Sequence, residues 1–158
     1  MKPRRRARVI ALQVLFEVDI VHHDPAFSLR ERLAVSPLPP EAQDFCQGLI
    51  HGVLTYRDAL DTIIQGIAPE WPVDQIAPID RNILRMAAFE ILVDHETPPK
   101  VAINEAVELA KMFGSDSSSR FVNGVLGTLL ADRAKYANQL KGAAGQAEPP
   151  GLQESPAP

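Results

Sequence analysis

The sequence has few of the residues that build common catalytic and metal-binding sites. Its 158 residues include one cysteine, Cys46, so neither an internal disulfide nor a cysteine-rich metal site can form within the chain. No run of eighteen apolar residues is present, so we expect no membrane-spanning segment. Glycine-rich phosphate loops, nucleophile elbows and zinc-binding spacings are also missing. We therefore expect no catalytic residue, no metal site and no cofactor.

Strand signals are also scarce, because no stretch sustains an apolar–polar alternation and no Asn-Gly or Asp-Gly hairpin occurs. Apolar residues recur instead at helical spacing almost throughout. The sequence therefore predicts an all-α fold, a bundle of about seven helices. We expect helices at about 4–21, 27–34, 40–64 (with or without a break before Leu60), 79–94, 100–113 and 120–138. Gly114 is expected to end the fifth as a C′ glycine.

The two halves of the chain repeat each other's spacing. Phe45-x-x-Gly48 recurs 76 positions later as Phe121-x-x-Gly124. An echo at 73 positions pairs Arg8 with Arg81, Phe16 with Phe89 and Glu17 with Glu90. Glycine inside a helix costs about 1 kcal/mol relative to alanine, so we expect close helix packing at Gly48 and Gly124. The echo predicts two related three-helix units, with chance similarity of two amphipathic helices as the alternative.

The expected domain organisation follows from this echo and from composition. One helical domain is expected at 4–140, with sub-bundles at about 4–66 and 78–140 and a proline-rich connector between them. Residues 1–3 are expected to form a flexible start. A tail at 141–158 is rich in Gly, Ala and Pro and is expected to be disordered.

Charge is distributed unevenly along the chain. The net charge is −4, yet the first eight residues carry five positive charges and no acid, at Lys2, Arg4, Arg5, Arg6 and Arg8. Cations at a helix start are unfavourable for the helix dipole, so this placement predicts an anionic partner such as nucleic acid. The alternative is a solvated charged terminus. If all five bases neutralised phosphates of one strand, log affinity would fall with log salt by about 3.5.

A serine-rich segment before the last predicted helix is a second candidate anion site. The backbone N–H groups of a helix start bind anions, and serine hydroxyls, Arg120 and Asn123 add hydrogen-bond donors. Phe121 could stack on an unpaired base. The alternative is an ordinary serine cap, with Phe121 packed in the core.

The first predicted helix carries two apolar stripes where a surface helix normally carries one. One stripe comprises Ile10, Val14, Val18 and Val21, and the other comprises Val9, Leu12, Phe16 and Ile20. We favour burial of this helix between two layers. The alternative is that the second stripe, including Phe16, is an exposed surface that binds a partner.

Two segments carry a family resemblance. Lys100-Val-Ala-Ile-Asn-Glu-Ala-Val-Glu-Leu-Ala-Lys-Met-Phe-Gly114 and Arg120-Phe-Val-Asn-Gly-Val-Leu126 resemble the NusB family of bacterial transcription antitermination factors. The basic start and the stretch from Asp80 to Leu92 also resemble it. The similarity covers about residues 4–132.

The resemblance implies an all-α fold of two helical sub-bundles and a function in binding without catalysis. NusB proteins bind the boxA element of ribosomal RNA leader transcripts beside NusE, a small-subunit ribosomal protein, and join the antitermination complex of RNA polymerase. Carried onto this sequence, the RNA contacts are Arg4, Arg5, Arg6, Arg8, Ser117, Ser118, Arg120, Phe121 and Asn123. Phe16 and Asp80 correspond to partner-binding positions. A cytoplasmic location is expected.

Two other functions also fit the sequence. One is a free-standing RNA-binding unit related to the NusB-like domain of ribosomal RNA methyltransferases. The other is a homodimeric helical adaptor whose basic start pairs with an acidic patch. RNA binding would weaken steeply with salt, whereas an apolar dimer interface would barely respond.

Overall fold

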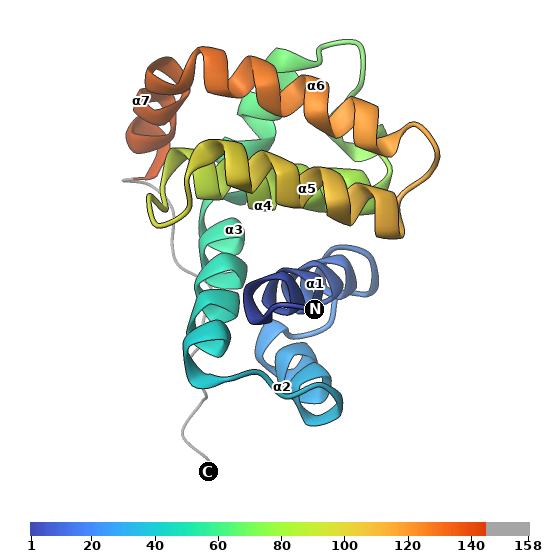
Figure 1. The fold of residues 1–158 in the computed structure, drawn as a ribbon. Helices are drawn as coiled ribbons and strands as arrows, with labels where there is room; N and C mark the ends of the chain where they lie inside the picture. Colours follow the sequence, from blue (N-terminus) through green and yellow to red (C-terminus); the bar gives the residue numbers. More distant parts are fainter. Residues whose placement is uncertain (145–158) are drawn as a thin grey trace. The chain divides into compact units, whose positions relative to one another are not determined.

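The computed structural model describes residues 1–144, and every regular element in that range is helical. The predicted all-α fold is therefore confirmed. The described chain forms seven α-helices (Figure 1), namely α1 (Pro3–Phe16), α2 (Pro25–Val35), α3 (Pro40–Ile67), α4 (Pro78–Leu92), α5 (Pro99–Phe113), α6 (Ser118–Ala131) and α7 (Arg133–Ala144). No helix within the described residues is long and apolar enough to cross a membrane.

Prolines mark the starts of most of these helices. Pro3, Pro25, Pro78 and Pro99 lie in the first turns of α1, α2, α4 and α5, and α3 begins at Pro40. The first turn of a helix does not need the N–H that proline lacks, and the fixed φ of proline already matches the helix. Local chemistry therefore explains why these helix starts lie close to the predicted ones.

Two boundaries differ from the predictions, and one alternative that the sequence left open is decided. The helix expected from residue 40, with or without a break, runs unbroken through 28 residues as α3. The single helix predicted at 120–138 is two helices, because the chain leaves helical geometry at Asp132, where φ is −119° and ψ is 37°. The first predicted helix changes at Phe16 into a short π-helix, Glu17–Val21, which ends at His22 in the left-handed conformation.

The chain divides into two compact units, and the division falls inside α3. Unit 1 comprises Met1–Thr55, and unit 2 comprises the described residues from Tyr56 onward. The expected sub-bundle limits at 66 and 78 do not coincide with this boundary, because α3 continues past it.

In unit 1, α1 packs against α2 and the adjoining π-helix. Ile10 and Val14 of the first stripe and Leu12 of the second are buried, whereas Val9 and Phe16 of the second stripe are half-buried. Beyond Phe16 the pattern ends, and Ile20 and Val21 are exposed. The expected burial therefore holds for the first stripe along α1, holds only in part for the second stripe, and fails for the end of the π-helix.

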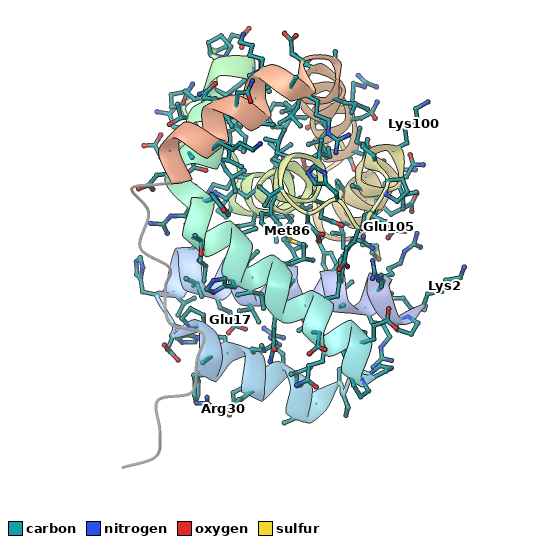
Figure 2. The ribbon with its side chains drawn as sticks, turned by 90° about the vertical axis from the view of Figure 1, so that its left-hand side faces the viewer. Lys2, Glu17, Arg30, Met86, Lys100 and Glu105 are labelled. Carbon is teal, nitrogen blue, oxygen red and sulfur yellow. The ribbon has the colours of Figure 1, made fainter. Side chains whose placement is uncertain are left out.

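In unit 2, α4 packs against α5, α6 and α7. Every residue from Asn82 to Leu92 is buried. Met86 lies among the helices of this unit, whereas Lys100 points outward at the start of α5 (Figure 2). Arg85 lies within this buried stretch, and Asp61 accepts from its Nε at 2.7 Å and from its Nη2 at 2.9 Å. A buried cation is thus neutralised inside unit 2.

The two helical glycines do not have the expected role. A Cβ placed on Gly48 or Gly124 would meet nothing within 4 Å, and both residues are exposed. The prediction of close helix packing at these positions is therefore wrong, because no atom of the described residues outside the helix itself lies near the place of a Cβ at either glycine.

The ends of the chain differ in part from the expected pattern. Pro3 is already the first residue of α1, with Lys2 as its N-cap. Residues 141–144, predicted as the beginning of a disordered tail, are the last turn of α7. The remainder of that predicted tail lies outside the described residues.

Candidate nucleic-acid interface

The basic start of the chain forms the first two turns of α1. Arg4 and Arg8 are four residues apart and therefore share one face of the helix. Their guanidinium carbons lie 4.5 and 4.8 Å from the centroid of the Phe45 ring on α3. Phe45 is buried. Its ring is therefore a platform for two cations, a role that a sequence pattern cannot reveal.

The two arginines differ in exposure. The side chain of Arg4 is 39% exposed, and its Nη2 lies 3.7 Å from Oε1 of Glu41, whose side chain is 90% exposed. Arg8 is only 4% exposed. Arg4 can therefore reach a phosphate from this position, whereas Arg8 in this conformation cannot.

Arg6 points away from this face, toward the connection between α2 and α3. Its Nη2 lies 3.5 Å from Oγ of Ser36 and donates to the carbonyl oxygen of Pro37. Arg5 is partly exposed. The predicted basic arm is thus a folded part of unit 1, whose arginines project in several directions.

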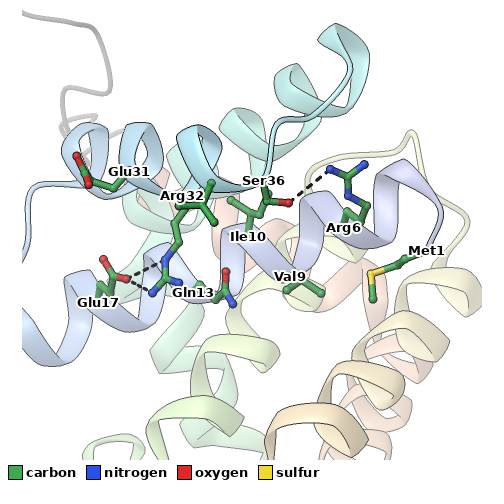
Figure 3. A pocket seen from close by; sticks show the side chains of 10 residues that line it. Met1, Arg6, Val9, Ile10, Gln13, Glu17, Glu31, Arg32 and Ser36 are labelled. Carbon is green, nitrogen blue, oxygen red and sulfur yellow. Dashed lines mark hydrogen bonds and ion pairs between the residues drawn. The ribbon is translucent and has the colours of Figure 1, made fainter.

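A groove of about 580 Å³ lies between α1 and α2 within unit 1. Figure 3 shows Arg6 reaching toward Ser36 at one end and Arg32 reaching toward Glu17 at the other. The groove is lined by Met1, Arg6, Val9, Ile10, Gln13, Glu17, Glu31, Arg32, Val35 and Ser36. Val9 and Ile10 give the groove apolar walls, Gln13 lies between its ends, and the charged ends carry Arg6 on one side and Glu17 with Arg32 on the other.

The Glu17 carboxylate ties the end of α1 to α2. Nε of Arg32 donates to Oε1 of Glu17 at 3.0 Å, and Nη2 of Arg32 donates to the same oxygen. Burial acts to raise the pKa of Glu17, but hydrogen bonds from Arg32 and His23 and the arginine charge outweigh it. The pKa therefore lies below its ordinary value.

The serine-rich segment of unit 2 folds back on itself. Ser118 is buried, and its Oγ accepts from the backbone N–H of Ser115 at 2.9 Å and lies 3.1 Å from Ser115 Oγ. Ser117, the N-cap of α6, makes no side-chain capping bond. The hydroxyl of Ser118 therefore organises the loop from within, which local sequence did not indicate.

Gly114 is required here for space rather than for a left-handed backbone. Its φ is −90° and its ψ is −170°, so the predicted C′ glycine geometry is absent. A Cβ at this position would collide with the side chain of Ser118 and would lie 2.7 Å from the carbonyl oxygen of Ala110. The glycine therefore lets the serine loop close tightly on the end of α5.

The other predicted RNA contacts of unit 2 are accessible. Ser117, Arg120 and Asn123 are exposed, and Phe121 is half-buried. Arg120 and Asn123 are three residues apart on α6 and share a face. One guanidinium and one amide thus point outward near the helix start, where they can donate to an anion or to base edges.

The two predicted partner-binding residues have different environments. Phe16, the last residue of α1, is half-buried. Asp80 lies in the first turn of α4 and is 8% exposed, and its Oδ1 has no hydrogen-bond partner among the described residues. Phe16 thus lies at an accessible surface, and Asp80 does not.

Among the described residues, neither Cys46 nor the His, Asp and Glu side chains are arranged for nucleophilic catalysis or metal binding. Burial raises the pKa of the Cys46 thiol to about 12, so it is neither a thiolate nucleophile nor a metal ligand at neutral pH. No cluster of His, Cys, Asp and Glu among these residues could hold a metal ion.

Comparison with known proteins places the chain in a family. The NusB family model matches residues 5–131, which is most of the sequence. The chain belongs to the NusB family. It is 51% identical over 141 residues to the transcription antitermination protein NusB of Roseiflexus sp. (strain RS-1), covering 88% of this chain and 97% of that protein. Over 136 residues it is 47% identical to the NusB of Dehalococcoides mccartyi (strain CBDB1), covering 86% and 95%.

Solved NusB structures share the fold. The structure of T. maritima NusB superposes with a TM-score of 0.78 at 30% identity, covering 87% of this chain and 98% of that one. A chain from a complex of the antitermination factors NusB and NusE with double-stranded RNA superposes with a TM-score of 0.76 at 23% identity, covering 83% and 98%. The helical architecture described above is therefore that of the NusB family.

Proposed function

We propose that this protein is a transcription antitermination factor. It binds the boxA RNA of ribosomal RNA leader transcripts together with NusE and helps RNA polymerase avoid premature termination. The observation that carries this proposal is the 51% identity across 97% of a protein that is named for transcription antitermination. The protein acts by binding rather than by catalysis, and it works in the cytoplasm, where transcription occurs.

Two groups of side chains support RNA binding. In unit 1, Arg4 and Arg5 project from the first turn of α1 and are at least partly exposed. In unit 2, Arg120 and Asn123 project from the start of α6 and are exposed. Arginines bind phosphates, whereas amide and aromatic side chains read unpaired bases. Both groups therefore offer the chemistry that single-stranded RNA requires.

The direct test is the fluorescence anisotropy of a labelled boxA-type RNA. The protein is titrated with and without NusE at two salt concentrations, and a scrambled RNA is the reference. We expect tighter binding of boxA than of the scrambled RNA, a further gain with NusE and a loss of affinity with salt. Equal affinity for both RNAs, with or without NusE, would contradict the proposal.

A charge-matched pair of variants locates the contact. Arg4→Ala combined with Arg5→Ala removes two charges from α1, and we expect the salt slope to fall by about 1.4. Arg30→Ala combined with Lys135→Ala removes the same charge from exposed positions on α2 and α7. This second variant should keep the slope of the wild type. Equal losses in both variants would show that only net charge matters.

A further inference from the structure

The ring of Phe45 holds two cations that repel each other. Arg4 and Arg8 approach the ring centroid to 4.5 and 4.8 Å, and like charges four residues apart on a helix are unfavourable. The negative face of an aromatic ring attracts a guanidinium, more strongly where water is excluded. Phe45 is only 7% exposed, so the attraction acts at a mostly dry site. The ring therefore restricts where the side chain of Arg4 can lie.

Glu41 holds Arg4 from the solvent side. It lies one helical turn before Phe45 on α3, and its Oε1 is 3.7 Å from Nη2 of Arg4. Its side chain is 90% exposed, so the ion pair is screened by water and salt. An incoming phosphate carries similar charge and more acceptor oxygens, so it can replace this carboxylate at little cost.

We propose that Phe45 and Glu41 together set the affinity of Arg4 for an RNA phosphate. Phe45 is a positioning residue that fixes the guanidinium at the start of α1, and Glu41 is a competing anion that the phosphate displaces. This inference rests on the proposed RNA-binding function. Two residues on one face of α3, neither of them basic, thus set the RNA affinity of a basic residue on α1.

The competing role of Glu41 is tested by Glu41→Gln, which removes the charge and keeps the shape. We expect RNA to bind about two- to five-fold more tightly at low salt, because no carboxylate has to be displaced. The gain should shrink as salt rises, because salt screens the exposed pair in the wild type as well.

Glu70→Gln is the matched control. It makes the same change of net charge at an exposed carboxylate in the connector between α3 and α4. We expect it to change RNA affinity much less than Glu41→Gln does. An equal gain in the two variants would show an effect of net charge alone and would overturn the role of Glu41.

The positioning role of Phe45 is tested by Phe45→Leu and Phe45→Tyr. Leucine keeps an apolar side chain but removes the ring, and we expect RNA affinity to fall about three- to ten-fold. Tyrosine keeps the ring and should restore most of the affinity. In the protein without RNA, loss of the ring should also shift the NMR signals of the Nε–H groups of Arg4 and Arg8.

A structural control separates positioning from stability. Ile50→Val removes one methylene group from a fully buried residue of α3 and leaves the Phe45 ring in place. Its RNA affinity should match that of the wild type even though its unfolding midpoint falls. If Phe45→Leu and Ile50→Val lower affinity in proportion to stability, the positioning role of Phe45 is overturned.

The outcomes distinguish this inference from the function on which it rests. If the wild type binds boxA no better than scrambled RNA, the proposed function fails and this inference fails with it. If the wild type is specific but Glu41→Gln and Phe45→Leu bind as it does, only this inference is overturned.

Discussion

Helices α1 and α4 carry the same residue types at the same spacing and use them differently. Phe16 ends α1 half-buried, whereas its counterpart Phe89 is buried in α4 and stacks on Tyr56, with ring centroids 6.1 Å apart. Glu17 lies at the rim of the groove in unit 1 and pairs with Arg32. Its counterpart Glu90 is 2% exposed. One pattern therefore gives a helix that ends at a surface and a helix that lies in a core.

The difference follows from what packs around each helix. α4 contacts three helices of its own unit, and its residues from Asn82 to Leu92 are buried on every side. α1 loses regular α geometry at Phe16, and the π-helix after it exposes Ile20 and Val21. Amphipathic spacing thus specifies a helix but not how many of its sides are covered.

The largest expected effect on stability distinguishes Phe89 of α4 from Phe16 of α1. Phe89→Ala should lower the free energy of unfolding by about 3–4 kcal/mol, because it empties a buried site and removes the contact with Tyr56. Phe16→Ala should cost about 1 kcal/mol, because the ring is already partly in water. Urea unfolding of the two variants measures both values. Equal losses would mean that α1 and α4 are equally buried.

The buried ion pair of α4 gives the next largest effect. The side chain of Arg85 is 6% exposed and that of Asp61 is 25% exposed. Asp61→Asn removes the carboxylate charge that accepts two hydrogen bonds from the buried guanidinium, and we expect a loss of about 2–3 kcal/mol in urea unfolding.

Asp58→Asn is the control for that variant, because the Asp58 side chain is fully exposed and lies 3.9 Å from Arg57. It should unfold at the same urea concentration as the wild type. A similar shift in both variants would mean that the Arg85 pair is solvated.

The helices were largely predictable from the sequence, because their signals are local. Proline at a helix start and apolar residues at helical spacing act within a few residues of one another. The break at Asp132 was not predicted. Just after it, Arg133 donates from Nε to the carbonyl oxygen of Ile91 at 3.0 Å, and its Nη2 lies 2.9 Å from Nδ1 of His95. These contacts hold the start of α7 against residues about 40 positions earlier, and a local pattern cannot indicate them.

The sequence indicates which residue types the candidate site contains, but it does not indicate how their side chains are arranged. The excess of arginine at the start of the chain predicts an anion-binding region from the sequence alone. Packing then decides that Arg8 lies buried on Phe45, that Arg6 donates to Pro37 and that the Ser118 hydroxyl is used within its loop. The RNA contacts assigned to these residues remain predictions.

A smaller effect is expected at the rim of the groove. Glu17→Gln removes the charge that Arg32 and His23 stabilise, and we expect a loss of about 1 kcal/mol at neutral pH. The pKa of Glu17 is lowered by folding, so its stabilising effect is complete above the unfolded-state pKa of about 4.3. It disappears as the pH falls through the lower, folded-state pKa. Urea unfolding from pH 7 to pH 3 should show the wild type and the variant converging in acid. A constant difference would contradict this assignment.

The smallest expected effect is at the end of the π-helix that follows α1, where the backbone has a positive φ. His22 has φ 61° and ψ 32°, and among the described residues no other side-chain-bearing residue has a positive φ. Glycine adopts this conformation without the steric cost that a Cβ imposes, although it also loses more backbone freedom on folding. We therefore expect His22→Gly to raise the free energy of unfolding by about 0.5 kcal/mol. His23→Gly should lower it, because His23 has an ordinary backbone and contacts Glu17 and Phe27. If both variants lose stability in thermal unfolding, the left-handed turn is not a source of strain.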